Sequence, residues 1–337
     1  MSKSIKVLLV GGGGYVGVEL QRLLAESEYE VRVLDTFWYP AGRWSKSDGN
    51  FVSNIEYVEG DIRDSEVVRK ALIGIDACIH LACISNDPSY ELNPNLARSI
   101  NFEAFVMFIA QINNSSVKKL IYASSSSVYG VKEEENVTED LICEPLTDYS
   151  KYKVMCENTA LNNISDKVCL VVVRPSTVCG YSRRQRFDLV VNILTLSALT
   201  NSVINVDGGD QFRPNLHIKD MNAAYKLLLE TNPKIIDRKI YNIAGENLTV
   251  LEIAKKVQFQ IGNSCEIIIH PVKDQRSYRV SGKRIAADTG FIPKFSVNDA
   301  ITDLADAFNL GKFLDLESEA YYNIKQMKLL MSKALIK

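Results

Sequence analysis

Two residues four positions apart, Tyr149 and Lys153, have the types and the spacing that proton transfer requires. Residues i and i+4 lie on one face of a helix, so the lysine ammonium would lie beside the tyrosine phenol. A neighbouring cation stabilises phenolate and lowers the phenol pKa from its usual value of about 10 toward the range of a general base. Such a base removes the proton of an alcohol while a nicotinamide cofactor accepts the hydride.

A serine run, Ser124 to Ser127, ends an apolar stretch upstream of this pair. A serine hydroxyl at a strand end would hold the same substrate oxygen as the tyrosine. Tyr-x-x-x-Lys by itself is weak evidence, because chance places the pair on many exposed helix faces. Its position after a glycine-rich N-terminal loop and after the serines is the order that a doubly wound dinucleotide-binding fold requires.

The N-terminal loop carries glycines at three-residue spacing, Gly11, Gly14 and Gly17. Residues 5–10 form an apolar, β-branched run that predicts a buried strand, and residues 18–25 have helical periodicity. Glycine lets backbone N–H groups approach a pyrophosphate, and the helix N-terminus adds partial positive charge. A flexible turn is the alternative, which the flanking strand and helix disfavour.

Asp35 ends the second predicted strand and indicates which dinucleotide is bound. Its carboxylate would accept hydrogen bonds from the ribose diol of NAD and would repel the 2′-phosphate of NADP. NAD is therefore expected. The alternative is that Arg32 or Arg43 folds back to bind a phosphate.

Together these motifs resemble the extended short-chain dehydrogenase/reductase family, specifically its NAD-dependent nucleotide-sugar epimerases and dehydratases. The resemblance runs from about Ile5 to Pro293, with Val10 in place of the family's threonine before the glycine loop. It implies a set of cofactor-binding residues: Gly11, Gly14, Tyr15, Val16, Gly17, Asp35, Asp61, Ile62, Leu81, Ala82, Cys83, Asn101, Tyr149 and Lys153.

The same resemblance implies the catalytic and substrate-binding residues. The catalytic set is Ser125, Tyr149 and Lys153, and the substrate set is Ser125, Thr177, Arg213 and Arg276. The last two arginines match residues that bind the diphosphate of a nucleoside-diphosphate sugar, although a solvated loop charge is the ordinary alternative. Whether Arg183, Arg184 and Arg186 bind a phosphate or cover the surface stays open.

Ser126 and Ser127 bear on the reaction type. They stand where the family's 4,6-dehydratases have an Asp-Glu pair and where its decarboxylases keep a glutamate, so elimination and decarboxylation are disfavoured. The first expectation is an epimerase that transiently oxidises the sugar 4-position. The alternatives are a 4-dehydrogenase or 4-keto reductase, and less favoured a 4,6-dehydratase; Thr177 replaces an asparagine common in 4-epimerases. A dinucleotide-sensing regulator is the non-enzyme alternative, but such proteins commonly lose the Tyr/Lys pair.

Strand and helix patterns alternate along the first half of the chain, which predicts an α/β, Rossmann-type doubly wound parallel sheet. The alternation weakens after residue 175. We therefore expect an NAD-binding domain of residues 1–175 with about 220–245, and a smaller C-terminal substrate-binding lobe of residues 176–219 and 246–337.

Composition excludes several other classes. A net charge of −2 without a basic run argues against nucleic-acid binding, and no apolar stretch reaches the ~18 residues of a membrane span. Seven scattered cysteines without CxxC indicate buried thiols in a reducing, cytoplasmic location, and a catalytic role for Cys179 is disfavoured. The three histidines lack metal-ligand spacing, so no metal is expected. The family resemblance implies a homodimer.

Overall fold

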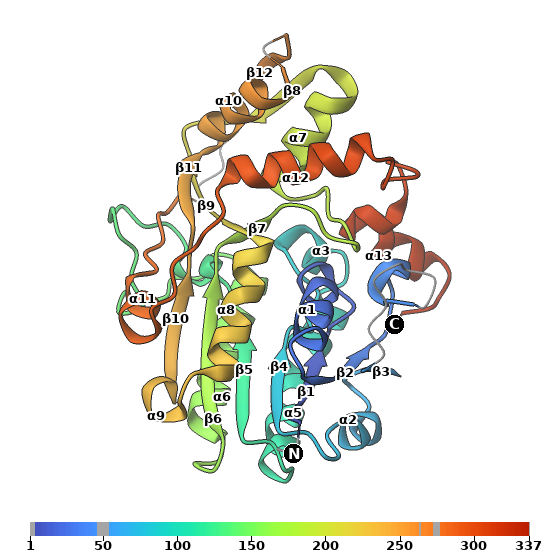
Figure 1. Cartoon of the computed structure of the whole chain (residues 1–337), viewed down its shortest axis with the longest axis vertical. Coiled ribbons are helices and arrows are strands. Elements are labelled where there is room, and N and C mark those ends of the chain that lie inside the picture. The colour runs from blue at the N-terminus through green and yellow to red at the C-terminus, as the bar shows by residue number, and fades with distance from the viewer. Residues whose placement is uncertain (1–3, 46–53, 263, 272–276, 337) are drawn as a thin grey trace.

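A seven-stranded parallel sheet forms the centre of the computed structural model, which describes residues 4–45, 54–262, 264–271 and 277–336 (Figure 1). The strand order is β10-β6-β5-β4-β1-β2-β3, with every pairing parallel. The bounds are β1 Lys6–Val10, β2 Glu30–Asp35, β3 Ile55–Glu59, β4 Ala77–His80, β5 Lys119–Ala123, β6 Cys169–Pro175 and β10 Lys239–Ile243. The predicted Rossmann-type fold is confirmed.

Helices cover both faces of this sheet because its strands are apolar on both sides. Along β1, Val7 and Leu9 face one core cluster, whereas Leu8 and Val10 face the other, as a period of two requires. One face is covered by α2 Ser65–Ala71, α5 Ala104–Asn113 and α6 Asp148–Asn163. The other is covered by α1 Tyr15–Ala25, α8 Ile218–Glu230 and α9 Pro233–Ile236. Short helices α3 Asp87–Glu91 and α4 Pro94–Arg98 follow β4, and single turns span Pro40–Gly42, Ser99–Glu103, Ser126–Tyr129 and Glu319–Tyr321.

The turn from β1 into α1 requires glycine at two positions. Gly11 has φ +77°, and a Cβ on it would lie 2.4 Å from the backbone of Ala82. A Cβ on Gly17 would lie 2.4 Å from the carbonyl oxygen of Gly12. The loop is therefore packed tightly against its neighbours, and it aims the N-terminus of α1 at the carboxyl edge of the sheet.

A smaller lobe lies above the carboxyl edge of the sheet in Figure 1. It contains the strands β7 Thr177–Cys179, β9 Phe212–His217 and β11 Glu246–Thr249, and the pair β8 Val203–Asp207 and β12 Glu266–His270. The helices α7 Val190–Asn201, α10 Val250–Ile261 and α12 Val297–Asn309 surround a separate apolar core with β8.

Two segments that the sequence assigned to the lobe pack on the sheet instead. α11 Lys283–Thr289 places Ile285 in the core beside Tyr241 of β10, and α13 Asn323–Ser332 places Met327 and Leu330 in the opposite core. The predicted division at residue 246 stays a prediction, and these two helices share the apolar cores of the sheet. An amphipathic helix buries its apolar face against whichever apolar surface the rest of the fold leaves exposed. The periodicity of its sequence does not identify that surface.

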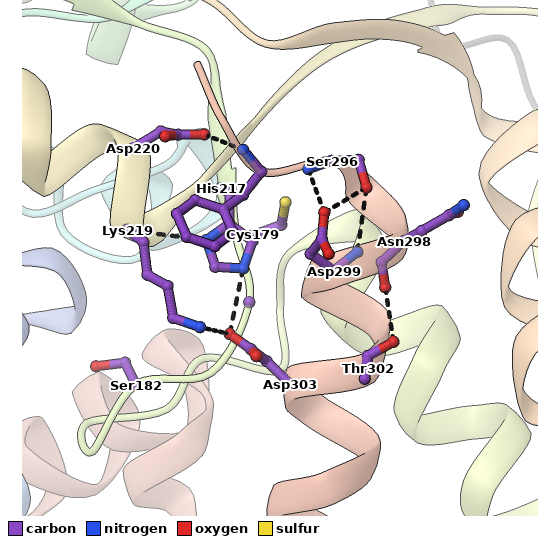
Figure 2. A network of polar contacts seen from close by, with 12 residues as sticks. Cys179, Ser182, His217, Lys219, Asp220, Ser296, Asn298, Asp299, Thr302 and Asp303 are labelled. Atoms are coloured by element: carbon purple, nitrogen blue, oxygen red, sulfur yellow. Dashed lines mark hydrogen bonds and ion pairs between the residues drawn. The ribbon is translucent and has the colours of Figure 1, made fainter.

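His217, between β9 and α8, contacts the helix α12 of the lobe (Figure 2). Its Nε2 lies 3.3 Å from Asp303 Oδ2, and Lys219 Nζ lies 2.7 Å from the same oxygen. Asp220 accepts hydrogen bonds from the backbone N–H groups of Lys294 and Phe295, at 3.0 and 2.9 Å. These contacts join α8, which packs on the sheet, to the lobe.

Candidate active site

A cavity of about 420 Å³ lies between the carboxyl edge of the sheet and the lobe, within the range of small-molecule sites. Most residues predicted for cofactor, catalysis or substrate line it together: Gly11, Gly14, Tyr15, Val16, Gly17, Asp35, Asp61, Ile62, Leu81, Ala82, Cys83, Ser125, Tyr149, Lys153, Thr177 and Arg213. The cavity therefore joins the glycine loop to the Tyr/Lys pair in one continuous space.

At the glycine-loop end, Asp35 is held by the backbone. Its carboxylate accepts hydrogen bonds from the N–H groups of Gly13 at 2.9 Å and Phe37 at 2.8 Å. Burial raises the pKa of Asp35, and these two N–H groups and the nearby charge of Arg184 oppose that rise. A half-buried carboxylate in this position suits a ribose diol and disfavours a second anion.

The two arginines considered as 2′-phosphate ligands make other contacts. Arg32 Nε lies 2.8 Å from Glu56 Oε2, and Arg32 Nη1 donates to the carbonyl of Ala71. Arg43 pairs with Glu59, and its guanidinium lies 3.7 Å from the ring centroid of Phe37. Neither residue lines the cavity, which agrees with NAD as the cofactor.

Asn101, which is predicted to bind the cofactor, is not among the described residues that line the cavity, and its predicted role stays a prediction. It is buried, and its carboxamide accepts a hydrogen bond from Ile84 N at 2.8 Å and donates one to Ile84 O at 3.0 Å. Both ends of the amide are thus used to fix the segment after β4. Asn101 positions this cavity wall and does not form part of it.

Tyr149 and Lys153 lie on the first two turns of α6, which begins at the N-cap Thr147. Lys153 Nζ lies 5.8 Å from the Tyr149 ring centroid and donates a 2.6 Å hydrogen bond to the carbonyl of Ala123. Burial raises the pKa of Tyr149 well above its usual value, nearby Cys83 and Asp87 raise it further, and a hydrogen bond with Ser125 opposes them. The lowered pKa expected from the spacing alone is thus not what this structure gives, because burial disfavours the charged phenolate.

A chain of hydroxyl groups leads from Ser125 to a carboxylate. Ser125 Oγ lies 2.9 Å from Ser127 Oγ, and Ser150 Oγ lies 2.8 Å from Ser127 Oγ. Thr147 Oγ1 lies 3.1 Å from Ser150 Oγ and 2.6 Å from Asp87 Oδ1. Asp87 lines the cavity but is not among the predicted site residues, because no spacing rule connects the loop after β4 with the start of α6.

A buried ion pair supports the catalytic helix from behind. Glu157, one turn after Lys153, lies 2.6 Å from Arg174 of β6, and Ser124 donates a hydrogen bond to the same carboxylate. Arg174 Nη1 also lies 2.9 Å from the hydroxyl of Tyr129. Since each partner would be costly to leave buried alone, this network fixes α6 against the ends of β5 and β6.

The predicted substrate residues are placed unequally. Thr177 on β7 and Arg213 on β9 both line the cavity from the lobe side, and Arg213 Nη1 donates to Phe212 O at 3.0 Å. Arg276 lies outside the described residues, so its predicted role stays a prediction. Of the arginine triplet, Arg184 and Arg186 line the cavity.

Cys179 has a histidine neighbour that sequence reasoning did not find, since His217 is its partner across β7 and β9. The thiol is buried, burial raises its pKa, and its Sγ contacts the carbonyl of Leu216. His217 Nδ1 accepts the N–H of Lys219 at 3.1 Å. A buried thiol with a raised pKa is a poor nucleophile, so the pair is structural.

The described residues contain neither a metal site nor a membrane-spanning helix. No group of three His, Cys, Asp or Glu side chains in these ranges is arranged to hold a metal ion. Over the same ranges, no helix combines the length and the apolar character that crossing a membrane requires.

The Rossmann-type sheet, the glycine loop and the Ser/Tyr/Lys group on one cavity define a dinucleotide-dependent enzyme that acts on an alcohol or carbonyl carbon. A family model described as "NAD dependent epimerase/dehydratase family" matches residues 7–244. The chain belongs to this family, and its cofactor is NAD. The carboxylate of Asp35, held by the backbone N–H of Gly13, and the glycine loop fit that cofactor.

Relatives of known activity come from both branches of the family. The chain is 27% identical over 275 residues to UDP-glucose 4-epimerase of Lactobacillus helveticus, covering 75% of this chain and 82% of that protein. It is 24% identical over 316 residues to dTDP-glucose 4,6-dehydratase of Streptomyces niveus, covering 90% and 92%. A solved structure of UDP-glucuronic acid 4-epimerase from Bacillus cereus, with UDP-glucuronic acid and NAD, has TM-score 0.79 and 26% identity over 91% of this chain and 99% of that one.

Proposed function

We propose that the protein is a nucleotide-sugar epimerase that oxidises and then re-reduces the sugar 4-position. The observation that carries this proposal is the joint placement of Ser125, Tyr149 and Lys153 on a cavity continuous with the glycine loop. The relatives named as UDP-sugar 4-epimerases support the same reaction. The homodimer and the cytoplasmic location implied by the sequence stay predictions, of which sedimentation equilibrium tests the first.

Tyr149 acts as the general base in this proposal. It takes the proton of the sugar 4-hydroxyl, while Ser125 donates a hydrogen bond to the same oxygen as it becomes a carbonyl. NAD supplies the hydride acceptor for the oxidation and the hydride donor for the return. Tyr149 then gives its proton back to the oxygen, so that the sugar is regained with the opposite configuration at one carbon.

The lobe holds the part of the substrate that does not react. Arg213 would bind the diphosphate, since a guanidinium binds phosphate oxygens bidentately, and Thr177 would contact the sugar. Binding energy from the nucleotide is thereby available to hold the substrate while the freed keto-sugar turns its other face toward the nicotinamide.

The carboxylates on the cavity support epimerisation over elimination of water. In the part of the chain that the structure describes, the carboxylates that line it are Asp35 and Asp61, at the cofactor end, and Asp87. A 4,6-dehydratase requires a further acid and base at the sugar 5- and 6-positions, and Ser126 and Ser127 replace that pair. Among the described residues, Asp87 is the carboxylate that lies near Tyr149, and a second one does not line that end of the cavity.

Product analysis in D₂O tests the proposal. The protein would be incubated with UDP-glucose, UDP-glucuronic acid or dTDP-glucose, without added cofactor, and the products read by NMR. We expect a 4-epimer without deuterium at carbons 4 and 5, because the hydride returns to the carbon it left. A 4-keto-6-deoxy sugar carrying deuterium would identify a dehydratase, and a keto-sugar formed only with added NAD would identify a dehydrogenase. Either outcome would refute the epimerase.

A further inference from the structure

The three arginines after β7 have different surroundings. Arg183 is outside the cavity lining, with its guanidinium 4.9 Å from the ring of Trp44. Arg186 lines the cavity and is neutralised by Asp188, at 2.9 Å. Arg184 also lines the cavity and is only 3% exposed, yet its Nε and Nη1 have no hydrogen-bond partner among the described residues.

A buried guanidinium with unused N–H groups is energetically unfavourable unless an anion completes its hydrogen bonds. Burial lowers the pKa of Arg184 to about 10, so the side chain is still protonated near neutral pH. Its Nη2 donates to Asn323 Oδ1 at 2.5 Å, which is a neutral acceptor, and the carboxyl groups of Asp35 and Asp188 act on its charge without accepting a hydrogen bond from it. The missing acceptor has to come from the cavity.

The neighbours of Arg184 place it at the cofactor end of the cavity. Its guanidinium lies 3.5 Å from the ring centroid of Tyr39, and its charge acts on the carboxyl group of Asp35. Asp35 is in turn bonded to Gly13 of the glycine loop. The anion nearest to this loop in a bound dinucleotide is its diphosphate, which the N-terminus of α1 also attracts.

We propose that Arg184 binds the diphosphate of NAD and, through Asn323, holds the C-terminal helix α13 over the cofactor. Asn323 begins α13 and also accepts a hydrogen bond from Tyr39 at 3.1 Å. One turn later, Gln326 donates to the carbonyl of Trp38 at 2.5 Å. The cofactor end of the cavity is thus bordered by Trp38 and Tyr39, by Arg184 and by α13, and NAD release requires these contacts to separate.

The first test compares Arg184→Gln with Arg183→Gln, a matched change one residue away that does not touch the cavity. Competition against NADH, measured by its fluorescence on the full-length protein, gives the affinities of ADP and of adenosine. We expect the ratio of ADP affinity to adenosine affinity to fall about tenfold to a hundredfold in Arg184→Gln, the scale of a charge-assisted hydrogen bond. The ratio should be unchanged in Arg183→Gln, and NADH should dissociate faster only from the Arg184 variant.

Several results would overturn the proposal. If Arg184→Gln lowered the affinities for ADP and for adenosine by the same factor, the role of Arg184 would be purely structural. Weaker binding of UDP with unchanged ADP binding would assign Arg184 to the sugar nucleotide. A selective loss of NADP binding would assign it to a 2′-phosphate. All three measurements follow the binding of a cofactor or a nucleotide and do not follow turnover. They are therefore independent of whether the enzyme is an epimerase.

Asn323→Asp provides a second test that does not remove the arginine. The new carboxylate would neutralise Arg184 within the protein and compete with the diphosphate, while side-chain size is kept. We expect weaker ADP binding, faster NADH release and an unchanged adenosine affinity. Unaltered ADP binding in a variant that melts at the wild-type temperature would contradict the proposal.

Discussion

Lys153 Nζ lies 5.8 Å from the ring centroid of Tyr149 and donates its 2.6 Å hydrogen bond to the carbonyl of Ala123. The cation is therefore held beneath the base by the end of β5 and does not contact the phenol oxygen directly. Burial dominates the pKa of Tyr149 in this arrangement and raises it. Turnover must then depend on the charges that act on the phenol.

Tyr149→Phe should lower turnover by at least about a hundredfold, the usual scale of acid/base catalysis. Only the phenol oxygen and its hydrogen bond with Ser125 are lost, so NADH affinity and melting temperature should be close to those of the parent. Steady-state kinetics beside an NADH titration would check this, and near-parental turnover would remove Tyr149 from the base role.

Lys153→Met should shift the rising limb of the pH–rate profile to higher pH. The reactive form is the phenolate, and removing a positive charge makes deprotonation harder, so a higher pH is needed for the same fraction of phenolate. The rate at neutral pH falls and partly recovers as the pH is raised. A limb that stays in place would show that Lys153 acts only in positioning.

Asp87→Asn should shift the same limb to lower pH. The Asp87 charge raises the pKa of Tyr149, and the amide removes that charge while it still accepts the hydrogen bond from Thr147. Asp148→Asn is the control, because this exposed carboxylate pairs with Lys151 on the outer side of α6. A shift in both variants, or in neither, would contradict a specific effect of Asp87.

Asp35→Ala should weaken NAD binding and improve NADP binding relative to NAD. The carboxylate that would accept the ribose hydroxyls is lost, and so is the charge that repels a 2′-phosphate. Fluorescence titrations with NADH and NADPH give both constants. If the parent protein already prefers NADPH, the role assigned to Asp35 is wrong.

Arg213→Ala should weaken nucleoside-diphosphate binding by about 1.5 to 3 kcal/mol, one charge-assisted hydrogen-bonding group. NADH affinity should be unchanged, because the dinucleotide is held at the glycine loop. Calorimetry with UDP and dTDP is the measurement, with Arg238→Ala as control, since Arg238 pairs with Asp166 away from the cavity. Arg276→Ala should behave as Arg213→Ala does; unchanged nucleotide binding in either variant removes that residue from the site.

Local sequence patterns determined the sheet and the ends of its strands. Apolar runs such as Lys6–Val10, each followed by a helical period, predict buried parallel strands because burial on both faces allows few polar residues. The glycine loop and the Tyr/Lys pair could also be identified from local sequence, because each of these functions requires particular residue types at a fixed, short spacing. Parallel strands then bring their carboxyl ends to one edge, so the meeting of Gly14, Ser125 and Tyr149 followed from the fold class.

Contacts between distant segments were decided only by the tertiary structure. Asn323 meets Tyr39 across 284 residues, and Asp87 meets Thr147 across 60. No periodicity or spacing links such pairs, because the packing of α13 and of the loop after β4 depends on which surfaces the rest of the chain leaves open. The raised pKa of Tyr149 was likewise decided only by the tertiary structure, because burial depends on all the atoms that surround the phenol. The spacing of Tyr149 and Lys153 had predicted a lowered pKa.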